Sequence, residues 1–284
     1  MDSRSIGDLK VSSVGLGGMP MSVEGRPDED RSLRTIHRAL DLGITLIDTA
    51  DAYCLGADEV GHNERLIAKG LATWSGDSSE VLVATKGGHT RGSNGEWGLN
   101  GSPEYLKRAC EASLKALGVD AIGLYQYHRP DPNVPYVEAV GALKELQDEG
   151  KVRMVGLSNA TIEQIEESRR VVDIVSVQNE FSPRFRSSAN ELEHCAREGI
   201  AFLPWSPLGG MGSAADLGSE HAAFAEVAEA HGVSPQQVAI AWVLAKAEVV
   251  IPIPGSSRPE TIADSAQAVD LRLDPEDLRK LDAE

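Results

Sequence analysis

Three side chains that can hold or transfer a proton stand at the ends of three short apolar runs. Asp48, Lys86 and His128 each close such a run, and a carboxylate, an amine and an imidazole together can carry out acid–base chemistry. In parallel α/β folds the carboxyl ends of the strands meet at one edge, where catalytic groups collect. Charged groups are rarely buried without a partner, so Asp48 and Lys86 are expected to lie against each other. The spacing therefore predicts a proton-handling site at the carboxyl ends of a set of strands.

A serine offers a second kind of chemistry. The sequence Gly-Leu-Ser-Asn-Ala at 156–160 is similar to a nucleophile elbow, in which Ser158 would attack an ester. A triad would then need His194, His221 or His231 together with an acid. All three histidines lie in segments with a helical pattern rather than in loops, which counts against a serine hydrolase. That alternative also leaves the residues at the other strand ends without a role.

Eight short runs rich in Val, Ile and Leu alternate with amphipathic segments along the whole chain. The runs predict strands at residues 14–16, 45–47, 81–84, 122–127, 152–157, 174–177, 201–203 and 249–253. The helical patterns cover residues 28–42, 103–117, 136–149, 161–170, 191–198, 220–231, 235–246 and 259–269. About eight strand–helix units in a chain of this size are typical of an α/β fold of the (β/α)8 TIM barrel type. A doubly wound open sheet is the rival architecture.

The two ends of the chain add smaller elements. Residues before 14 predict a short N-terminal β-hairpin that turns at Gly7-Asp8 and caps one end of the barrel, and the tail after Asp274 predicts a C-terminal helix. No linker, composition break or internal repeat interrupts the alternation. We therefore expect residues 1–284 to form a single domain.

Charge and cysteine content limit the partners and the compartment. The 284 residues include 27 basic and 44 acidic side chains, a formal net charge of −17, which argues against nucleic acid as a partner. Three cysteines without a CxxC spacing argue against a disulfide framework or a bound metal and suggest a reducing compartment. The first ten residues lack the apolar core of a secretory signal, and the longest apolar stretch, 238–245, is too short for a membrane span. We expect a soluble, cytoplasmic protein that does not bind membranes; its oligomeric state is left open.

Seven segments, taken in order, resemble the aldo-keto reductase family. They are IDTADAY (47–53), VATKGG (83–88), QYHRPD (126–131), GLSN (156–159), VQNEFSP (177–183), PWSPLGG (204–210) and IPIPGSSRPE (251–260). The resemblance covers about residues 9–270 and implies a barrel that reduces a small aldehyde or ketone to an alcohol with NADPH. It also implies that Asp48, Tyr53, Lys86 and His128 form the catalytic tetrad.

The residue types suit those implied roles. A tyrosine with an ordinary pKa near ~10 is a weak acid at neutrality. A lysine ammonium within hydrogen-bond reach favours the phenolate and lowers that pKa, while an aspartate holds the lysine. A histidine can orient the carbonyl and assist proton transfer.

The resemblance also implies which residues hold the cofactor. These are Gly18, Met19, Ser158, Asn159, Gln178, Trp205, Ser206, Pro207, Leu208, Gly210, Gly255, Ser256 and Arg258. Trp205 would stack on the nicotinamide ring, and Arg258 would grip a 2′-phosphate, which favours NADPH over NADH. One departure from the family pattern is Asp264-Ser265, where related sequences usually carry Glu-Asn against the adenine. Relatives that serve as accessory subunits, binding NADPH and a partner protein with little turnover, provide an alternative function.

Substrate choice is expected to depend on the long loops at the strand ends. These loops are residues 87–102, the proline-rich residues 129–135, and the glycine- and serine-rich residues 209–219. Trp97 is the predicted aromatic wall of the substrate pocket.

Overall fold

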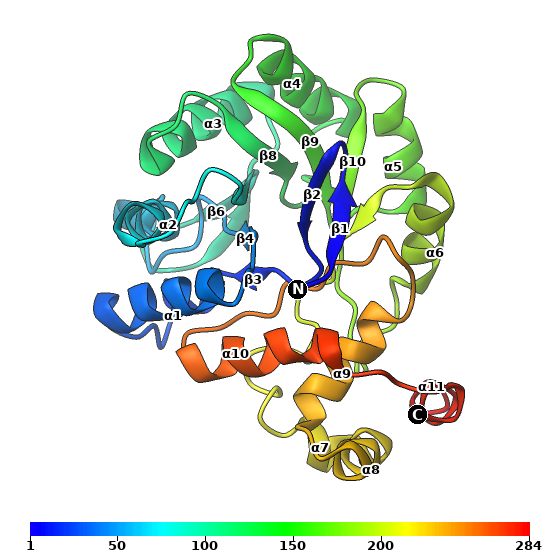
Figure 1. Ribbon diagram of the computed structural model, residues 1–284. Helices are drawn as coiled ribbons and strands as arrows, with labels where there is room; N and C mark the ends of the chain where they lie inside the picture. The colour runs from blue at the N-terminus through cyan, green and yellow to red at the C-terminus, as the bar shows by residue number, and fades with distance from the viewer.

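A curled parallel sheet forms the centre of the molecule, as the computed structural model of residues 1–284 shows (Figure 1). Seven strands lie in the order β11-β10-β9-β8-β5-β4-β3. Their bounds are β3 Leu16–Gly17, β4 Leu46–Asp48, β5 Leu82–Gly87, β8 Ile122–Tyr127, β9 Val152–Ser158, β10 Ile174–Gln178 and β11 Ala201–Phe202. Seven of the eight predicted runs thus form parallel strands, and every neighbouring pair is in parallel register.

The eighth run bridges the two edges of this sheet without forming a regular strand. Phe202 of β11 pairs with Val250 on one side, and Gly17 of β3 pairs with Gly255 on the other. The backbone amides of Ile251 and Ile253 donate hydrogen bonds to the β11 side. The carbonyls of Pro252 and Pro254 accept hydrogen bonds from the β3 side. Proline has no N–H, so Pro252 and Pro254 cannot donate the hydrogen bonds toward β3 that a regular strand would make. The prolines explain why the barrel closes through single bridges here.

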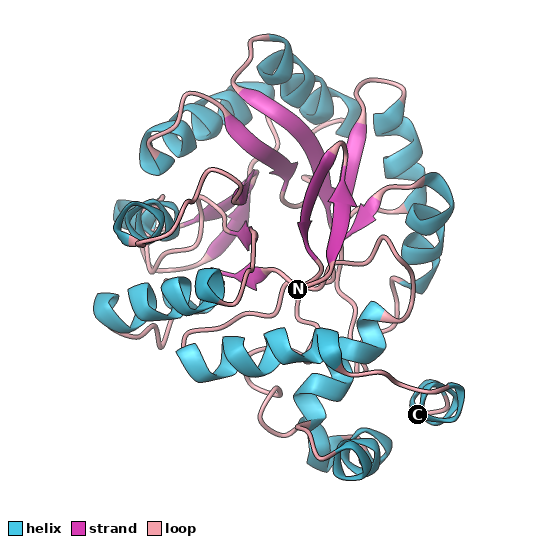
Figure 2. Ribbon diagram, in the orientation of Figure 1, coloured by secondary structure: helices cyan, strands magenta, loops and turns pink.

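Helices surround the barrel (Figure 2). They are α1 Glu29–Asp41, α2 His62–Thr73, α3 Pro103–Leu117, α4 Tyr136–Asp148, α5 Ile162–Arg169, α6 Ala189–Glu198, α7 Leu217–Glu220, α8 Ala222–His231, α9 Pro235–Leu244, α10 Pro259–Gln267 and α11 Pro275–Asp282. Helix α3 shows why such segments are recognisable: the Ser102 side chain accepts from an amide of the first turn, and Gly118 ends the helix with φ 68°. None of the helices combines the length and apolar character that crossing a membrane requires.

Besides the four-residue helix α7, most of which lies in the segment predicted as a glycine- and serine-rich loop, two larger elements are missing from the sequence predictions. Helix α2 follows Gly61, which supplies no side-chain cap, and its buried face includes Asn63 and Glu64. A buried face with two polar residues weakens the apolar periodicity that identifies helices. The second is an antiparallel hairpin, β6 His89–Arg91 with β7 Trp97–Leu99, inside the segment predicted as a long loop.

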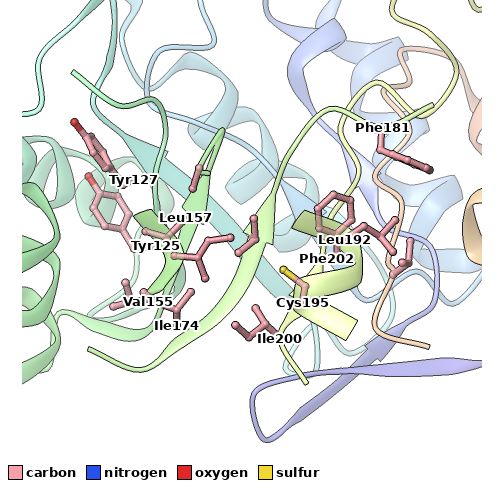
Figure 3. Packing of buried hydrophobic residues seen from close by; sticks show 14 of the residues in the cluster. Tyr125, Tyr127, Val155, Leu157, Ile174, Phe181, Leu192, Cys195, Ile200 and Phe202 are labelled. Carbon is pink, nitrogen blue, oxygen red and sulfur yellow. The ribbon is translucent and has the colours of Figure 1, made fainter. Parts of the chain in front are cut away.

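The chain termini pack against the barrel. Strands β1 Ser3–Ile6 and β2 Leu9–Ser12 form an antiparallel hairpin, turning through Gly7 at φ 54°, that lies across one end of the barrel in Figure 1. Ile6 is fully buried and belongs to the apolar cluster inside the barrel, beside Leu46 and Ile253. Outside the sheet, a larger cluster joins strands to helices, with Phe202 and Leu192 among its members (Figure 3). These packed layers fix the positions of the strand ends that carry the polar residues.

Candidate active site

The Lys86 ammonium is the centre of a buried polar cluster at the carboxyl ends of β4 and β5. Its Nζ atom lies 2.7 Å from Asp48 Oδ2 and donates to the Thr49 carbonyl at 2.8 Å and to the Tyr53 hydroxyl at 3.2 Å. The Gln178 amide donates to the other Asp48 oxygen at 2.7 Å. Lys86 is fully buried, so its three partners satisfy a cation that has no access to water. The expected contact between Asp48 and Lys86 therefore forms.

The electrostatics of this cluster keep both proton carriers protonated at neutral pH. Burial opposes the charge of Lys86, but the attraction of Asp48 and Tyr53 outweighs it and raises the pKa of Lys86. Burial also raises the pKa of Tyr53, and the Lys86 ammonium opposes this without reversing it. This corrects the expectation from the sequence, in which Lys86 lowers the pKa of Tyr53. In the fold the loss of hydration is the larger effect.

His128 contacts Tyr53 from the end of β8. The two rings meet edge to face with centroids 5.7 Å apart. Burial, together with Lys86, His89 and Arg129, holds the pKa of His128 well below its usual value. His128 is therefore neutral at neutral pH, and its buried Nδ1 atom has no hydrogen-bond partner. A neutral imidazole beside a phenol hydroxyl is suited to hydrogen-bonding and orienting a carbonyl oxygen.

A cavity of about 630 Å³ opens above Tyr53 and His128 at the carboxyl ends of the strands. Ten of the thirteen predicted cofactor residues line it: Met19, Ser158, Asn159, Gln178, Trp205, Ser206, Pro207, Leu208, Gly210 and Gly255. Trp97 also lines the cavity, as expected for an aromatic wall, and contributes with Leu99 from the hairpin β6–β7. The remaining predicted cofactor residues, Gly18, Ser256 and Arg258, lie outside its walls.

The cavity holds the only two residues other than glycine with a left-handed backbone. Asn159 has φ 55° and Ser206 has φ 49°, and both line the cavity. Such conformations cost energy and gather at ligand sites. The indole Nε1 of Trp205 is buried without a partner, while the Asn159 amide is anchored to the His128 carbonyl at 3.0 Å. Amides, hydroxyls and an aromatic face on a strained backbone fit the carboxamide and ring of a nicotinamide cofactor.

The three predicted cofactor residues outside the cavity occupy defined places. Gly18 donates its amide to the Asp48 carbonyl, and a Cβ there would meet Asn63 Oδ1 at 2.5 Å, so packing requires this glycine. The Ser256 hydroxyl hydrogen-bonds within the first turn of α10, to the Arg258 carbonyl and to Thr261. Arg258 is exposed at the position that precedes α10. Their cofactor roles stay predictions.

The departure at Asp264 has a structural counterpart. Its carboxylate accepts from the Ser234 hydroxyl at 2.7 Å and from the Gln237 amide at 2.6 Å, which ties α10 to the start of α9. Both oxygens are thus occupied by protein donors. The side chain at the position where relatives usually contact adenine serves here in helix packing.

Ser158 is not arranged as a hydrolase nucleophile. Its hydroxyl donates to the Gln178 carbonyl at 2.9 Å. The candidate histidines pair elsewhere, His194 with Glu166, His221 with Glu284 and His231 with Asp277, all on or beside outer helices. Because none of the three candidate histidines is available to Ser158 as a base, the predicted triad does not form.

Several residues of the site carry no signal in the sequence. His89 stacks on Trp97 with centroids 4.5 Å apart, Arg91 covers Trp97 at 3.9 Å, and His89 meets His128 edge to face at 4.9 Å. The alternation of side chains along β6 places His89 and Arg91 on one face, but only the hairpin register brings Trp97 between them. Arg129, which also lines the cavity, follows His128 in the proline-rich loop 129–135, which the sequence assigns to substrate choice without singling out this arginine.

Comparison with known proteins agrees with this architecture. The sequence model described as "Aldo/keto reductase family" matches residues 13–283. An uncharacterized oxidoreductase of Schizosaccharomyces pombe is 35% identical over 283 residues, covering 98% of this chain and 88% of the relative. A probable aldo-keto reductase of Glycine max is 33% identical over 301 residues, covering 96% and 85%.

Solved structures give the same result. An aldo-keto reductase from Klebsiella pneumoniae in complex with NADPH superimposes with a TM-score of 0.81 at 26% identity, covering 100% of this chain and 95% of that one. The glycerol dehydrogenase of Gluconobacter oxydans gives a TM-score of 0.85 at 27% identity, covering 99% and 94%. Together with the family match over nearly the whole sequence, these likenesses show that the chain belongs to the aldo/keto reductase family.

Proposed function

We propose that this protein reduces an aldehyde or ketone to the alcohol with NADPH, using Asp48, Tyr53, Lys86 and His128 as its catalytic residues. One observation carries the proposal: the Lys86 ammonium contacts both Asp48 and Tyr53 at the base of a cavity that His128 also lines. Membership of the aldo/keto reductase family and the NADPH held by the similar Klebsiella pneumoniae enzyme support the same reaction.

The proposed chemistry divides between the cofactor and the chain. NADPH, when bound, supplies the hydride that reduces the carbonyl carbon. The Tyr53 hydroxyl donates its proton to the carbonyl oxygen, and the Lys86 ammonium stabilises the phenolate that this leaves. Asp48, held by Gln178, keeps Lys86 charged and in place. Neutral His128 donates a hydrogen bond that orients the carbonyl.

Residues around the cavity would hold the nicotinamide half of the cofactor. Trp205 offers a ring face for stacking, and Ser158, Asn159 and Gln178 offer polar groups for the carboxamide. Ser206, Pro207, Leu208 and Gly210 would border the pyrophosphate, and Gly255 would face the adenosine phosphate. Arg258, exposed at the start of α10, would meet the 2′-phosphate, the interaction that favours NADPH over NADH.

Two wider predictions belong to this proposal. Residues 1–284 act as one domain, supported by the burial of Ile6 inside the barrel and of Leu281, from α11, in the outer cluster. The protein works in the cytoplasm, supported by three buried cysteines that are all free thiols.

The test is loss of NADPH absorbance with 4-nitrobenzaldehyde, an activated aromatic aldehyde, run beside an NADH control. We expect turnover with NADPH and weaker turnover with NADH. A Ser158→Ala variant, assayed on 4-nitrophenyl acetate as well, addresses the hydrolase alternative: esterase activity that depends on Ser158 would contradict the proposal. Tight NADPH binding by fluorescence with no turnover of any carbonyl tested would favour an accessory subunit instead.

A further inference from the structure

Arg129 is a cation in the wall of the cavity that has no counter-ion. It lies directly after His128, is partly exposed, and lines the cavity together with Tyr53 and His128. Its guanidinium forms no ion pair and no side-chain hydrogen bond with the protein, and its one ring contact is the face of Trp205 at 5.8 Å. A guanidinium has five donors, and no protein group occupies those of Arg129, so they are free to engage a ligand that enters the cavity.

The other charged groups at the cavity do not neutralise Arg129. Asp48 lines the cavity, but its two oxygens are engaged by Lys86 and Gln178. Glu180 lies within electrostatic reach, since Arg129 opposes the rise that burial causes in the pKa of that carboxyl, yet the two form no ion pair. Arg91, the other arginine near the cavity, is buried and paired with Glu24. Arg129 is therefore the one unpaired formal charge among the residues that line the cavity.

The position of Arg129 is close to the reacting centre. Its charge contributes to lowering the pKa of both His89 and His128, and it also acts on Tyr53. The pKa of His89 falls to about 4, mainly through burial, so both imidazoles are neutral and leave Arg129 as the cationic group beside the carbonyl position. Trp97 and Leu99, supplied by β7, form an apolar part of the cavity wall.

We propose that Arg129 selects carbonyl substrates that carry a carboxylate, by pairing its guanidinium with that group while Trp97 and Leu99 contact the body of the substrate. This inference rests on the proposed function, because it assigns a substrate class to the same site. The planar fork of a guanidinium matches a carboxylate with two parallel hydrogen bonds. Arg129 is thus a specificity-determining residue, separate from the four that perform the chemistry.

The cofactor is the other anion that could meet Arg129, and the geometry favours the substrate. The residues expected to border the pyrophosphate are Ser206, Pro207, Leu208 and Gly210, whereas Arg129 directly follows His128 in the chain and its charge acts on the two histidines and Tyr53. An arginine that served the pyrophosphate would affect every substrate equally. One that serves the substrate discriminates by charge.

The experiment compares two aldehydes of similar size, 4-formylbenzoate and its intrinsically more electrophilic methyl ester, with purified wild-type protein and NADPH. We expect wild type to favour the carboxylate in kcat/KM. In Arg129→Met, kcat/KM for the carboxylate falls about tenfold to a hundredfold, chiefly through KM, as expected for loss of a charge-assisted hydrogen-bonded pair. The ester and the KM for NADPH change by less than about threefold, and Arg129→Lys keeps part of the preference. Arg153→Met, which removes an exposed arginine of β9, is the matched control and changes nothing.

Three results would overturn the inference. If the wild-type protein shows no preference for the carboxylate, there is no anion selectivity for Arg129 to explain. Equal losses on both aldehydes, or a raised KM for NADPH in Arg129→Met, would place Arg129 in the chemistry or in cofactor binding. Unchanged kinetics in Arg129→Met would leave it without a role.

A failure of the proposed function is recognised separately. If wild type reduces neither aldehyde, binding of 4-formylbenzoate is titrated by tryptophan fluorescence, because Arg129 lies over Trp205. Tighter binding to wild type than to Arg129→Met would then support carboxylate recognition without reduction. Equal or absent binding would overturn it.

Discussion

The two ends of the barrel each have a large cavity lined by an arginine, and only the arginine at the hairpin end is paired with the protein. Beneath the hairpin β1–β2, a cavity of about 790 Å³ is lined by the hairpin, the end of α9 and residues 268–273. There Arg4 donates to the carbonyls of Ala247 and Leu244 at 2.7 and 2.9 Å, so its charge completes the end of α9. At the carboxyl ends, the cavity of about 630 Å³ has His128 Nδ1, Trp205 Nε1 and Arg129 without protein partners.

The difference teaches that cavity size does not identify the site in this fold. At the hairpin end, the Arg4 guanidinium is hydrogen-bonded to protein carbonyls, which stabilises the fold. At the other end, strained backbone and unpaired groups are held by a rigid scaffold, which is how binding sites are built. Substitutions at the hairpin end should therefore change stability, and substitutions at the carboxyl end should change turnover.

The largest expected effect is on turnover. Tyr53→Phe removes the proton donor and little packing volume, so kcat should fall about 10²- to 10⁴-fold, the usual contribution of general acid catalysis. NADPH binding, measured by fluorescence, and the melting temperature should stay close to wild type. Retained turnover in the folded variant would transfer the acid role to another group, with His128→Gln as the next variant to assay.

The next effect is on stability, at the opposite end. Ile6 is fully buried inside the barrel, so Ile6→Ala should lower the free energy of unfolding by about 2–5 kcal/mol through lost burial and a new cavity. Urea denaturation measures this loss, and kcat per folded molecule should be unchanged. Leu9→Ala, at an exposed position of the same hairpin, is the control and should cost little. A drop in kcat with Ile6→Ala would show that the two ends are coupled.

The strands and the polar residues at their carboxyl ends could be predicted from the sequence, but the contacts of individual residues and helix α2 could not. Seven strands follow from apolar runs, and the residues after them meet because parallel strands share one edge, as Lys86 and Asp48 do. Arg129 could not be placed in the same way, because its importance lies in having no partner, a property of three-dimensional packing. Helix α2 escapes prediction because its buried Asn63 and Glu64 serve hydrogen bonds to Thr49 and Thr85 rather than apolar packing.

A smaller effect tests how far the functional end extends beyond its cavity. Arg258 is exposed and does not line the cavity, yet it precedes α10 on the side predicted for the 2′-phosphate. Arg258→Ala should raise the KM for NADPH about tenfold, equivalent to about 1.4 kcal/mol, and change the KM for NADH by less than about twofold. Steady-state kinetics with both cofactors measure the ratio. If both constants rise together, Arg258 does not distinguish the phosphate.

The smallest expected effect is on the pH dependence of stability, and it concerns Asp51, which follows Asp48 after the end of β4. Asp48 is held by Lys86 and Gln178, but Asp51 is buried with its Oδ1 atom unpartnered. Burial and the neighbouring Glu64 hold the pKa of Asp51 well above its usual range. A buried acid of this kind favours folding while it is protonated.

The sign of the pH dependence follows from that raised pKa. The stabilisation is complete below the pKa of the unfolded chain, about 3.9, and is lost as the pH rises through the higher pKa of the folded state. Asp51→Asn keeps the shape and removes the ionisation. The free energy of unfolding of the variant, relative to wild type, should therefore increase with pH when urea denaturation is compared at about pH 5 and about pH 8. Asp77→Asn is the control and should show no pH-dependent difference from wild type in this range, because the Ser79 amide lowers the pKa of that exposed carboxyl and it is ionised in both states above about pH 5. An equal pH dependence in wild type and Asp51→Asn would mean that Asp51 is ionised in the folded protein, with Lys86 as the charge that compensates it.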